Sequence, residues 1–337
     1  MCKLRHSECI INEQHLNALR NAVTIPEYDG ANFEDYITRI KQTKLYAFIK
    51  KMPKGSLLHT HLASSANIKK LFETIKYHDS ALYNKIYYIS DANAVDNNRA
   101  TSRIPKSSMP YNFPNNDKAL KYTTIIFDQG LCPANTAGWT QLLSAPVSEY
   151  ENLINSVSYV HGGTEQAWMD LRASGERIWA LVKHKGVYKY YFEILLQQIK
   201  DDGISHVEIK TTLDQLYTST KQKTHDGIEY YSETLNIDDA FIIRDSVYNG
   251  FGEPPTYGII LAVRRFDDNT KAIAPLDKIL EIAKIYPRQI VGIDVFGKET
   301  IATNKKNIEG ALGDRQAHYG RKPTVTIRDT FWRNHTH

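Results

Sequence analysis

Two nearly uninterrupted apolar stretches constrain the fold of this 337-residue chain more than any other feature. Residues 257–263 spell Tyr-Gly-Ile-Ile-Leu-Ala-Val, and residues 289–295 spell Gln-Ile-Val-Gly-Ile-Asp-Val. Such stretches are typical of strands that a parallel sheet buries on both faces. Between them, apolar residues recur at helical spacing over residues 275–286, with Pro275 in the expected first turn. The strand–helix–strand order predicts a βαβ unit and an α/β fold.

Further segments extend this alternation along the chain. Three more strands of the same sheet are predicted at residues 55–61, 204–210 and 324–327. A helix over residues 187–199, with an apolar side chain every four residues, precedes the second of them. Gly203 is well placed to end that helix.

The rest of the chain has weaker patterns. One helix is predicted to start at an Asn32 N-cap and to stop before Pro53. Residues 76–160 contain a short predicted strand at Ile86–Ile89, whereas residues 90–118 are rich in Asn, Asp, Ser and Pro. That composition predicts a long surface insertion.

The strand at 55–61 ends in two histidines, His59 and His61, with one residue between them. Successive side chains alternate between the faces of a strand, so both imidazoles are expected on one face. Two imidazoles there suit a divalent metal such as zinc, although two nitrogens do not complete a tetrahedral site. The simpler alternative is a pair of polar side chains where the strand enters a loop.

The residues around these histidines resemble the opening of the adenosine deaminase family, most closely its branch of adenosine deaminase-related growth factors. The resemblance rests on Met-Pro-Lys-Gly running into Leu-Leu-His-Thr-His over residues 52–61. It continues with Val-Glu-Ile-Lys at 207–210 and Gly-Ile-Asp-Val-Phe-Gly-Lys-Glu at 292–299. It implies zinc as a cofactor, bound by His59 and His61, and a purine nucleoside as the substrate.

Two further site residues follow from the same resemblance. Gly297 is implied to bring its backbone N–H to the purine, although a glycine in a βα turn can be turn chemistry alone. The family's His-Ala-Gly-Glu motif falls at residues 326–329, where this chain has Thr326 and Asp329. Asp329 is therefore the expected catalytic acid, one methylene shorter than glutamate, and threonine is a poor replacement for a zinc-binding histidine. Glu208 is expected in a half-buried strand, either in a packing salt bridge or with a direct catalytic role.

The resemblance implies a TIM-type (β/α) barrel. Five strands are predicted where eight close such a barrel, so we expect an incomplete barrel in a truncated, degenerate or partner-dependent chain. The expected domains are an N-terminal helical segment at 1–54 and a partial barrel at 55–337, with the insertion at about 76–160.

Composition excludes several other classes of protein. A net charge of +4, from 42 Lys+Arg and 38 Asp+Glu, is too small to indicate nucleic acid as a partner. No run of about 18 apolar residues predicts a membrane span, and no signal peptide is recognised. Cys2, Cys9 and Cys132 form no disulfide framework, which favours a reducing compartment, hence the cytoplasm over secretion. The sequence leaves open whether the chain forms a homo-oligomer.

The implied reaction is hydrolytic deamination of adenosine or deoxyadenosine to inosine or deoxyinosine plus ammonia. Because Thr326 stands at the third histidine position, we expect the chain itself to have little or no deaminase activity. Two alternatives stay open. One is a non-catalytic nucleoside-binding or growth-factor-like relative that has lost its zinc shell. The other is a metal-dependent hydrolase of a different amide or nucleobase.

Overall fold

The chain forms two compact units, Met1–Gly55 with Asp202–Ile204 and Ser56–Asp201 with Ser205–His337. The computed structural model describes residues 33–52, 54–89, 124–126, 139–158, 181–213, 216–224, 227–234, 238–264, 275–296 and 326–327, and single positions within 13–21 and 174–179. No helix in this described part has the length and apolar character needed to cross a bilayer.

The first unit contains helices α2 (Phe33–Lys41) and α3 (Lys44–Lys51). The single helix predicted here is therefore wrong, and Thr43 is the reason. Its backbone is extended, at φ −77° and ψ 148°, and its Oγ1 accepts a hydrogen bond of 3.1 Å from the N–H of Tyr46. A threonine side chain that caps the following turn ends one helix and begins the next.

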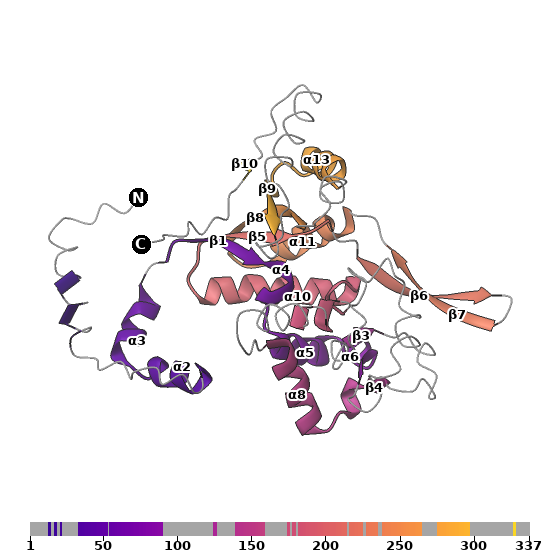
Figure 1. The fold of residues 1–337 in the computed structure, drawn as a ribbon, viewed down its shortest axis with the longest axis horizontal. Coiled ribbons are helices and arrows are strands. Elements are labelled where there is room, and N and C mark those ends of the chain that lie inside the picture. The colour runs from indigo at the N-terminus through magenta and orange to yellow at the C-terminus, as the bar shows by residue number, and fades with distance from the viewer. Residues whose placement is uncertain are drawn as a thin grey trace. The chain divides into compact units, whose positions relative to one another are not determined.

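The second unit is built on a five-stranded sheet in the order β1-β5-β8-β9-β10, in which every neighbouring pair is parallel (Figure 1). The strands are β1 (Ser56–His61), β5 (His206–Thr211), β8 (Thr256–Arg264), β9 (Ile290–Phe296) and β10 (Thr326–Ile327). All five coincide with predicted strands, so the α/β prediction is confirmed. In the described residues β1 and β10 are the sheet edges, and the incomplete (β/α) barrel stays a prediction.

Helices lie between the strands along the chain. Four of them are α5 (Ile68–His78), α10 (Lys185–Asp201), α11 (Asp238–Gly250) and α13 (Leu276–Ile285), of which α10 and α13 coincide with helices predicted above. The four apolar residues that predicted α10 are all buried. Gly203 lies two residues beyond its end with φ +71°, a left-handed conformation that favours glycine.

The core lies between one face of the sheet and helices α10 and α11. Tyr257 of β8 packs edge-on against Phe192 of α10 and Tyr248 of α11, with ring centroids 5.4 Å and 5.2 Å apart. Val207 and Ile209 of β5 are fully buried. Because side chains alternate along a strand, Glu208 and Lys210 lie on the opposite face.

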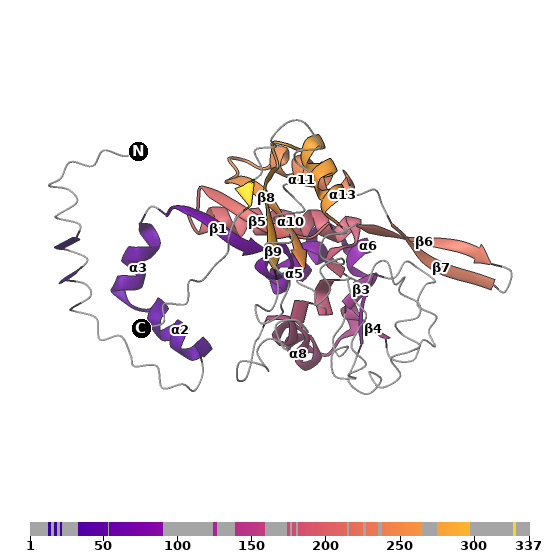
Figure 2. The same cartoon turned by 45° about the horizontal axis from the view of Figure 1, so that its top comes forward.

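Several elements were not predicted. They are α8 (Val147–Ser158), α11, and the antiparallel hairpin of β6 (Tyr217–Thr224) and β7 (Gly227–Thr234), which Figure 2 shows as a two-stranded ribbon. The expected strand at 86–89 is confirmed as β2 (Ile86–Ile89), which lies between β3 (Thr124–Ile126) and β4 (Trp139–Gln141) in a small antiparallel sheet. The short helices are α4 (Leu62–Ser65), α6 (Ser80–Tyr83) and η3 (Leu142–Ser144).

Candidate metal-binding site

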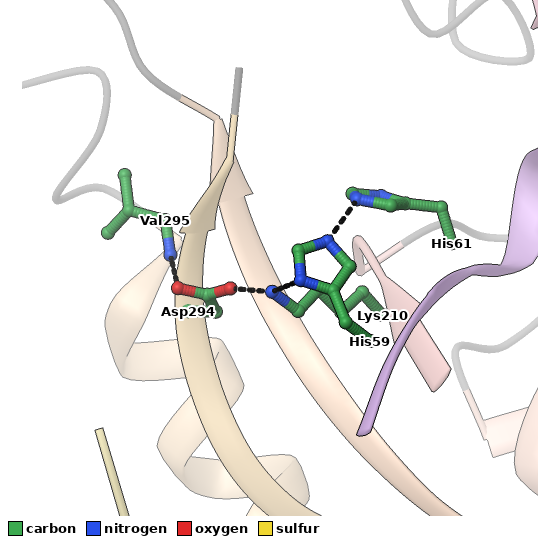
Figure 3. Close-up of polar contacts among 5 residues, drawn as sticks. All are labelled: His59, His61, Lys210, Asp294 and Val295. Atoms are coloured by element: carbon green, nitrogen blue, oxygen red, sulfur yellow. Dashed lines mark hydrogen bonds and ion pairs between the residues drawn. The ribbon is translucent and has the colours of Figure 1, made fainter. Parts of the chain in front are cut away.

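The two histidines at the end of β1 lie on one side of the strand, as their spacing predicts. Their Nε2 atoms are 3.3 Å apart, and their rings are tilted by 54° with centroids 5.3 Å apart (Figure 3). His61 is aligned with Lys210 of β5, so the pair lies at the carboxyl end of the parallel strands. Ligand sites of open α/β sheets gather at that edge.

The turn after His61 is fixed by hydrogen bonds from side chains. Ser65 Oγ donates to the carbonyl oxygen of His61 at 2.5 Å. The hydroxyl of Tyr191, on α10, donates to the carbonyl oxygen of Leu62 and accepts from the N–H of Ala66 at 3.3 Å. Burial raises the pKa of the Tyr191 hydroxyl, so it stays a neutral donor. Helix α10 thus holds the end of β1, and with it the two histidines.

A buried ion pair lies beside the histidines. Lys210 of β5 donates through Nζ to Oδ2 of Asp294 on β9, and these side chains are only 2% and 6% exposed. The other carboxylate oxygen, Oδ1, accepts from the N–H of Val295 at 2.7 Å. Because β8 lies between β5 and β9, the lysine side chain spans one strand to reach its partner.

Lys210 also reaches the nearer histidine. Its Nζ lies 3.4 Å from Nδ1 of His59. An ammonium group has only donors, so Nδ1 must be the acceptor of this contact. The result is a continuous polar chain from Asp294 through Lys210 and His59 to His61, drawn in Figure 3.

The surroundings keep both imidazoles neutral. Burial is the main cause that lowers the pKa of His61 to about 4, and the neighbouring His59 and Lys210 lower it further. Partial burial and then Lys210 lower the pKa of His59, while Asp294 acts in the opposite direction. Neutral imidazoles keep the lone pairs that a metal requires.

The spacing of the two Nε2 atoms fits a zinc ion. Zn–N bonds of about 2.0–2.1 Å at a tetrahedral angle place two ligand nitrogens about 3.3–3.4 Å apart, and the observed distance is 3.3 Å. Within the described ranges, no three His, Cys, Asp or Glu side chains form a metal-binding group. Two imidazole nitrogens are fewer than a tetrahedral zinc site requires, so zinc binding by His59 and His61 stays a prediction.

The structure describes only some of the other predicted site residues. Gly297 and Asp329 lie outside the described residues, so their roles stay predictions. Thr326 begins β10 and is paired with Gly292 of β9. Strand β5 is buried from Val207 to Thr211, so the half-buried strand predicted here is wrong. Glu208 is 3% exposed, and its Oε1 lies 4.0 Å from Nε2 of His206.

Lys210 and Asp294 were not predicted as neighbours of the histidines. The available signal was one lysine, Lys210, and one aspartate, Asp294, each in a predicted strand of the same sheet. Charged side chains are almost never fully buried unless they are paired. A buried lysine and a buried aspartate therefore each require a partner, but the sequence alone does not pair them.

The fold and the site together define a class of protein, a parallel α/β protein with paired histidines at the carboxyl end of its first strand. The chain is 23% identical over 310 residues to adenosine deaminase of Lutzomyia longipalpis, covering 88% of this chain and 54% of that protein. It is 24% identical over 302 residues to adenosine deaminase 2 of Dictyostelium discoideum, covering 86% and 49%. These sequence similarities support the adenosine deaminase family for this chain.

The chain spans about half the length of the curated relatives that it matches. No family model matches it. An adenine deaminase from Arthrobacter aurescens is structurally similar with a TM-score of 0.40 and 12% identity, over 82% of this chain and 57% of that one. An amidohydrolase from Burkholderia ambifaria with bound Zn gives a TM-score of 0.39 and 12% identity, over 84% and 53%. At these scores the likeness decides nothing about the site.

Proposed function

We propose that this chain binds a zinc ion through His59 and His61 and acts on a purine nucleoside by hydrolytic deamination, with adenosine or deoxyadenosine as the substrate. The observation that carries the proposal is the 3.3 Å separation of the two Nε2 atoms at the carboxyl end of β1. The similarity to curated proteins named adenosine deaminase supports the substrate class.

In this proposal each residue has one task. His59 and His61 hold the metal, the backbone N–H of Gly297 contacts the purine, and the Asp329 carboxyl group delivers a proton to the ring. A zinc ion, when bound, supplies the Lewis acidity for hydrolysis at neutral pH. Because Thr326 offers a hydroxyl where the family has an imidazole, and Asp329 is short, we expect turnover to be very low.

The first test measures zinc content and ammonia release on the full chain. The unaltered protein is expected to retain zinc after dialysis, and His59→Ala with His61→Ala is expected to lose it. His78→Ala removes an exposed histidine of α5 and is the matched control. Zinc content that does not depend on His59 and His61 would contradict the proposed site.

The second test restores the family residues. Thr326→His combined with Asp329→Glu is expected to raise ammonia release from adenosine at least tenfold, within the range of general acid–base contributions of about 10²–10⁴. Adenosine, deoxyadenosine, adenine and guanine are compared side by side. Faster turnover of a base than of a nucleoside would favour a hydrolase of another substrate class.

A non-catalytic nucleoside-binding role is the second candidate, and Thr326 is the observation that favours it. A protein of this kind binds adenosine without releasing ammonia, even after Thr326 and Asp329 are replaced. Calorimetric titration with adenosine, with and without zinc, separates it from a slow enzyme. Binding that persists in the absence of zinc and without turnover identifies the non-catalytic role.

A further inference from the structure

We propose that helices α2 and α3 of the first unit bind the surface of a bilayer that contains anionic lipids. The contact is made by the basic side chains of residues 39–54 (the basic segment) and by the exposed apolar side chains of Ile49 and Met52. This inference uses none of the residues of the proposed zinc site, so the two proposals are tested separately.

The basic segment has an uneven charge. Its six basic residues are accompanied by no Asp or Glu, whereas the whole chain has 42 Lys+Arg against 38 Asp+Glu. Five of the six are exposed, and within the part of the chain that the structure describes none of the six forms an ion pair. The six are Arg39, Lys41, Lys44, Lys50, Lys51 and Lys54. The described residues therefore leave the charge of this segment without a counter-charge.

Helix stability explains only part of this charge. Four of the six residues lie in the last turns of α2 and α3, where cations are favourable, namely Arg39, Lys41, Lys50 and Lys51. Lys54 donates through Nζ to the carbonyl oxygens of Lys50 at 3.3 Å and Asp202 at 2.7 Å. Lys44 begins α3, at the end where the helix dipole opposes a cation. Its charge needs another explanation.

Apolar side chains of the same segment are exposed beside the lysines. Leu45, Phe48, Ile49 and Met52 follow one another at steps of three and four residues, so they lie on one side of α3. Leu45 is 9% exposed, but Ile49 is 44% and Met52 is 42% exposed. The apolar stripe is therefore covered at the start of the helix and open at its end, next to Lys50 and Lys51.

An anionic bilayer matches both properties of this surface. Its headgroups offer negative charge to the lysines, and the boundary of its acyl layer accepts apolar side chains. The long stems of Lys50 and Lys51 keep their charged ends at the headgroups while Ile49 and Met52 enter. The phosphates of a nucleic acid offer the charge but no apolar layer. A helix that lies in the interface does not need the length of one that crosses the bilayer.

Cosedimentation of the full chain with lipid vesicles tests the proposal. We expect the chain to bind vesicles of phosphatidylcholine with phosphatidylserine at least about tenfold more tightly than vesicles of phosphatidylcholine alone. Added salt should weaken this binding, because ions screen exposed charges. Equal binding to the two kinds of vesicle, or binding to neither, would overturn the proposal.

Two charge variants locate the binding surface. Lys50→Gln with Lys51→Gln removes two exposed charges of the basic segment, and we expect binding to phosphatidylserine vesicles to weaken at least about tenfold. Lys69→Gln with Lys76→Gln removes two exposed charges of α5 and is the matched control, with binding close to that of the unaltered chain. Equal weakening by the two pairs would mean that the total charge of the chain, and not this segment, attracts it to vesicles.

An apolar variant separates a lipid surface from other polyanions. Ile49→Ser with Met52→Ser keeps every charge, and we expect it to weaken vesicle binding at least about threefold, because such binding scales with the apolar area that enters the bilayer. Both positions are exposed, so the fold should be retained, and circular dichroism measures this. Unchanged vesicle binding, or tighter binding to a duplex DNA oligonucleotide than to the vesicles, would overturn the proposal and favour a nucleic acid as the partner.

Discussion

The two faces of the parallel strands differ in how they are held together. One face presents side chains such as Val207 and Ile209 to the helices, and its contacts are apolar and non-directional. The other presents His59, Lys210 and Asp294, whose contacts depend on one donor meeting one acceptor. Loss of an apolar side chain lowers stability in proportion to the surface and cavity involved, whereas loss of one member of an ion pair leaves a buried charge.

Asp294→Ala is the severest test of this contrast. It leaves the Lys210 ammonium buried without its carboxylate, and we expect the free energy of unfolding to fall by about 3–5 kcal/mol. Urea denaturation of the metal-free protein measures this. Glu281→Gln is the control, because it breaks an ion pair with Lys278 whose side chains are 50% and 60% exposed, and it should cost less than about 1 kcal/mol. Equal losses would mean that burial of the pair is unimportant.

Apolar packing is tested by two isoleucines of helix α13. Ile282 is 1% exposed and Ile285 is 55% exposed. Ile282→Ala should lower the free energy of unfolding by about 2–5 kcal/mol through lost burial and a residual cavity. Ile285→Ala should change it by no more than about 0.5 kcal/mol. Chemical denaturation measures both variants, and a large effect of the exposed position would show that this helix face is covered.

Tyr191 joins the two faces, because its ring lies in the core and its hydroxyl fixes the turn after the histidines. Tyr191→Phe keeps the ring but leaves Leu62 O and Ala66 N without that hydroxyl. We expect a loss of about 1–3 kcal/mol in the free energy of unfolding, measured by urea denaturation, together with weaker zinc binding. Unchanged zinc affinity would show that the turn does not position His59 and His61.

The apolar face was largely predictable from the sequence, and the polar face only in part. Continuous apolar stretches identified the strands of the sheet, because the sheet buries them on both faces. Apolar residues every four positions identified α10, because a helix buries one of its faces. The His59–His61 contact followed from strand alternation alone. The Lys210–Asp294 pair depends on strand order, with β8 between the two partners, and strand order is a tertiary property that local spacing does not encode. The helix break at Thr43 depends on one side-chain cap that competes with an otherwise continuous helical pattern.

The last test of the polar face is the acid stability of the metal-free protein. The pKa of His61 is lowered to about 4 in the folded chain, against about 6.5 when unfolded. Between these values the unfolded state binds more protons, so the free energy of unfolding should decrease as the pH falls from about 6.5 toward about 4. Its contribution should be constant above that window. Urea midpoints across this range should fall less steeply for His61→Asn than for the exposed His78→Asn. Parallel slopes for the two variants would mean that His61 is no less basic folded than unfolded, and that burial at the end of β1 does not favour the neutral ring.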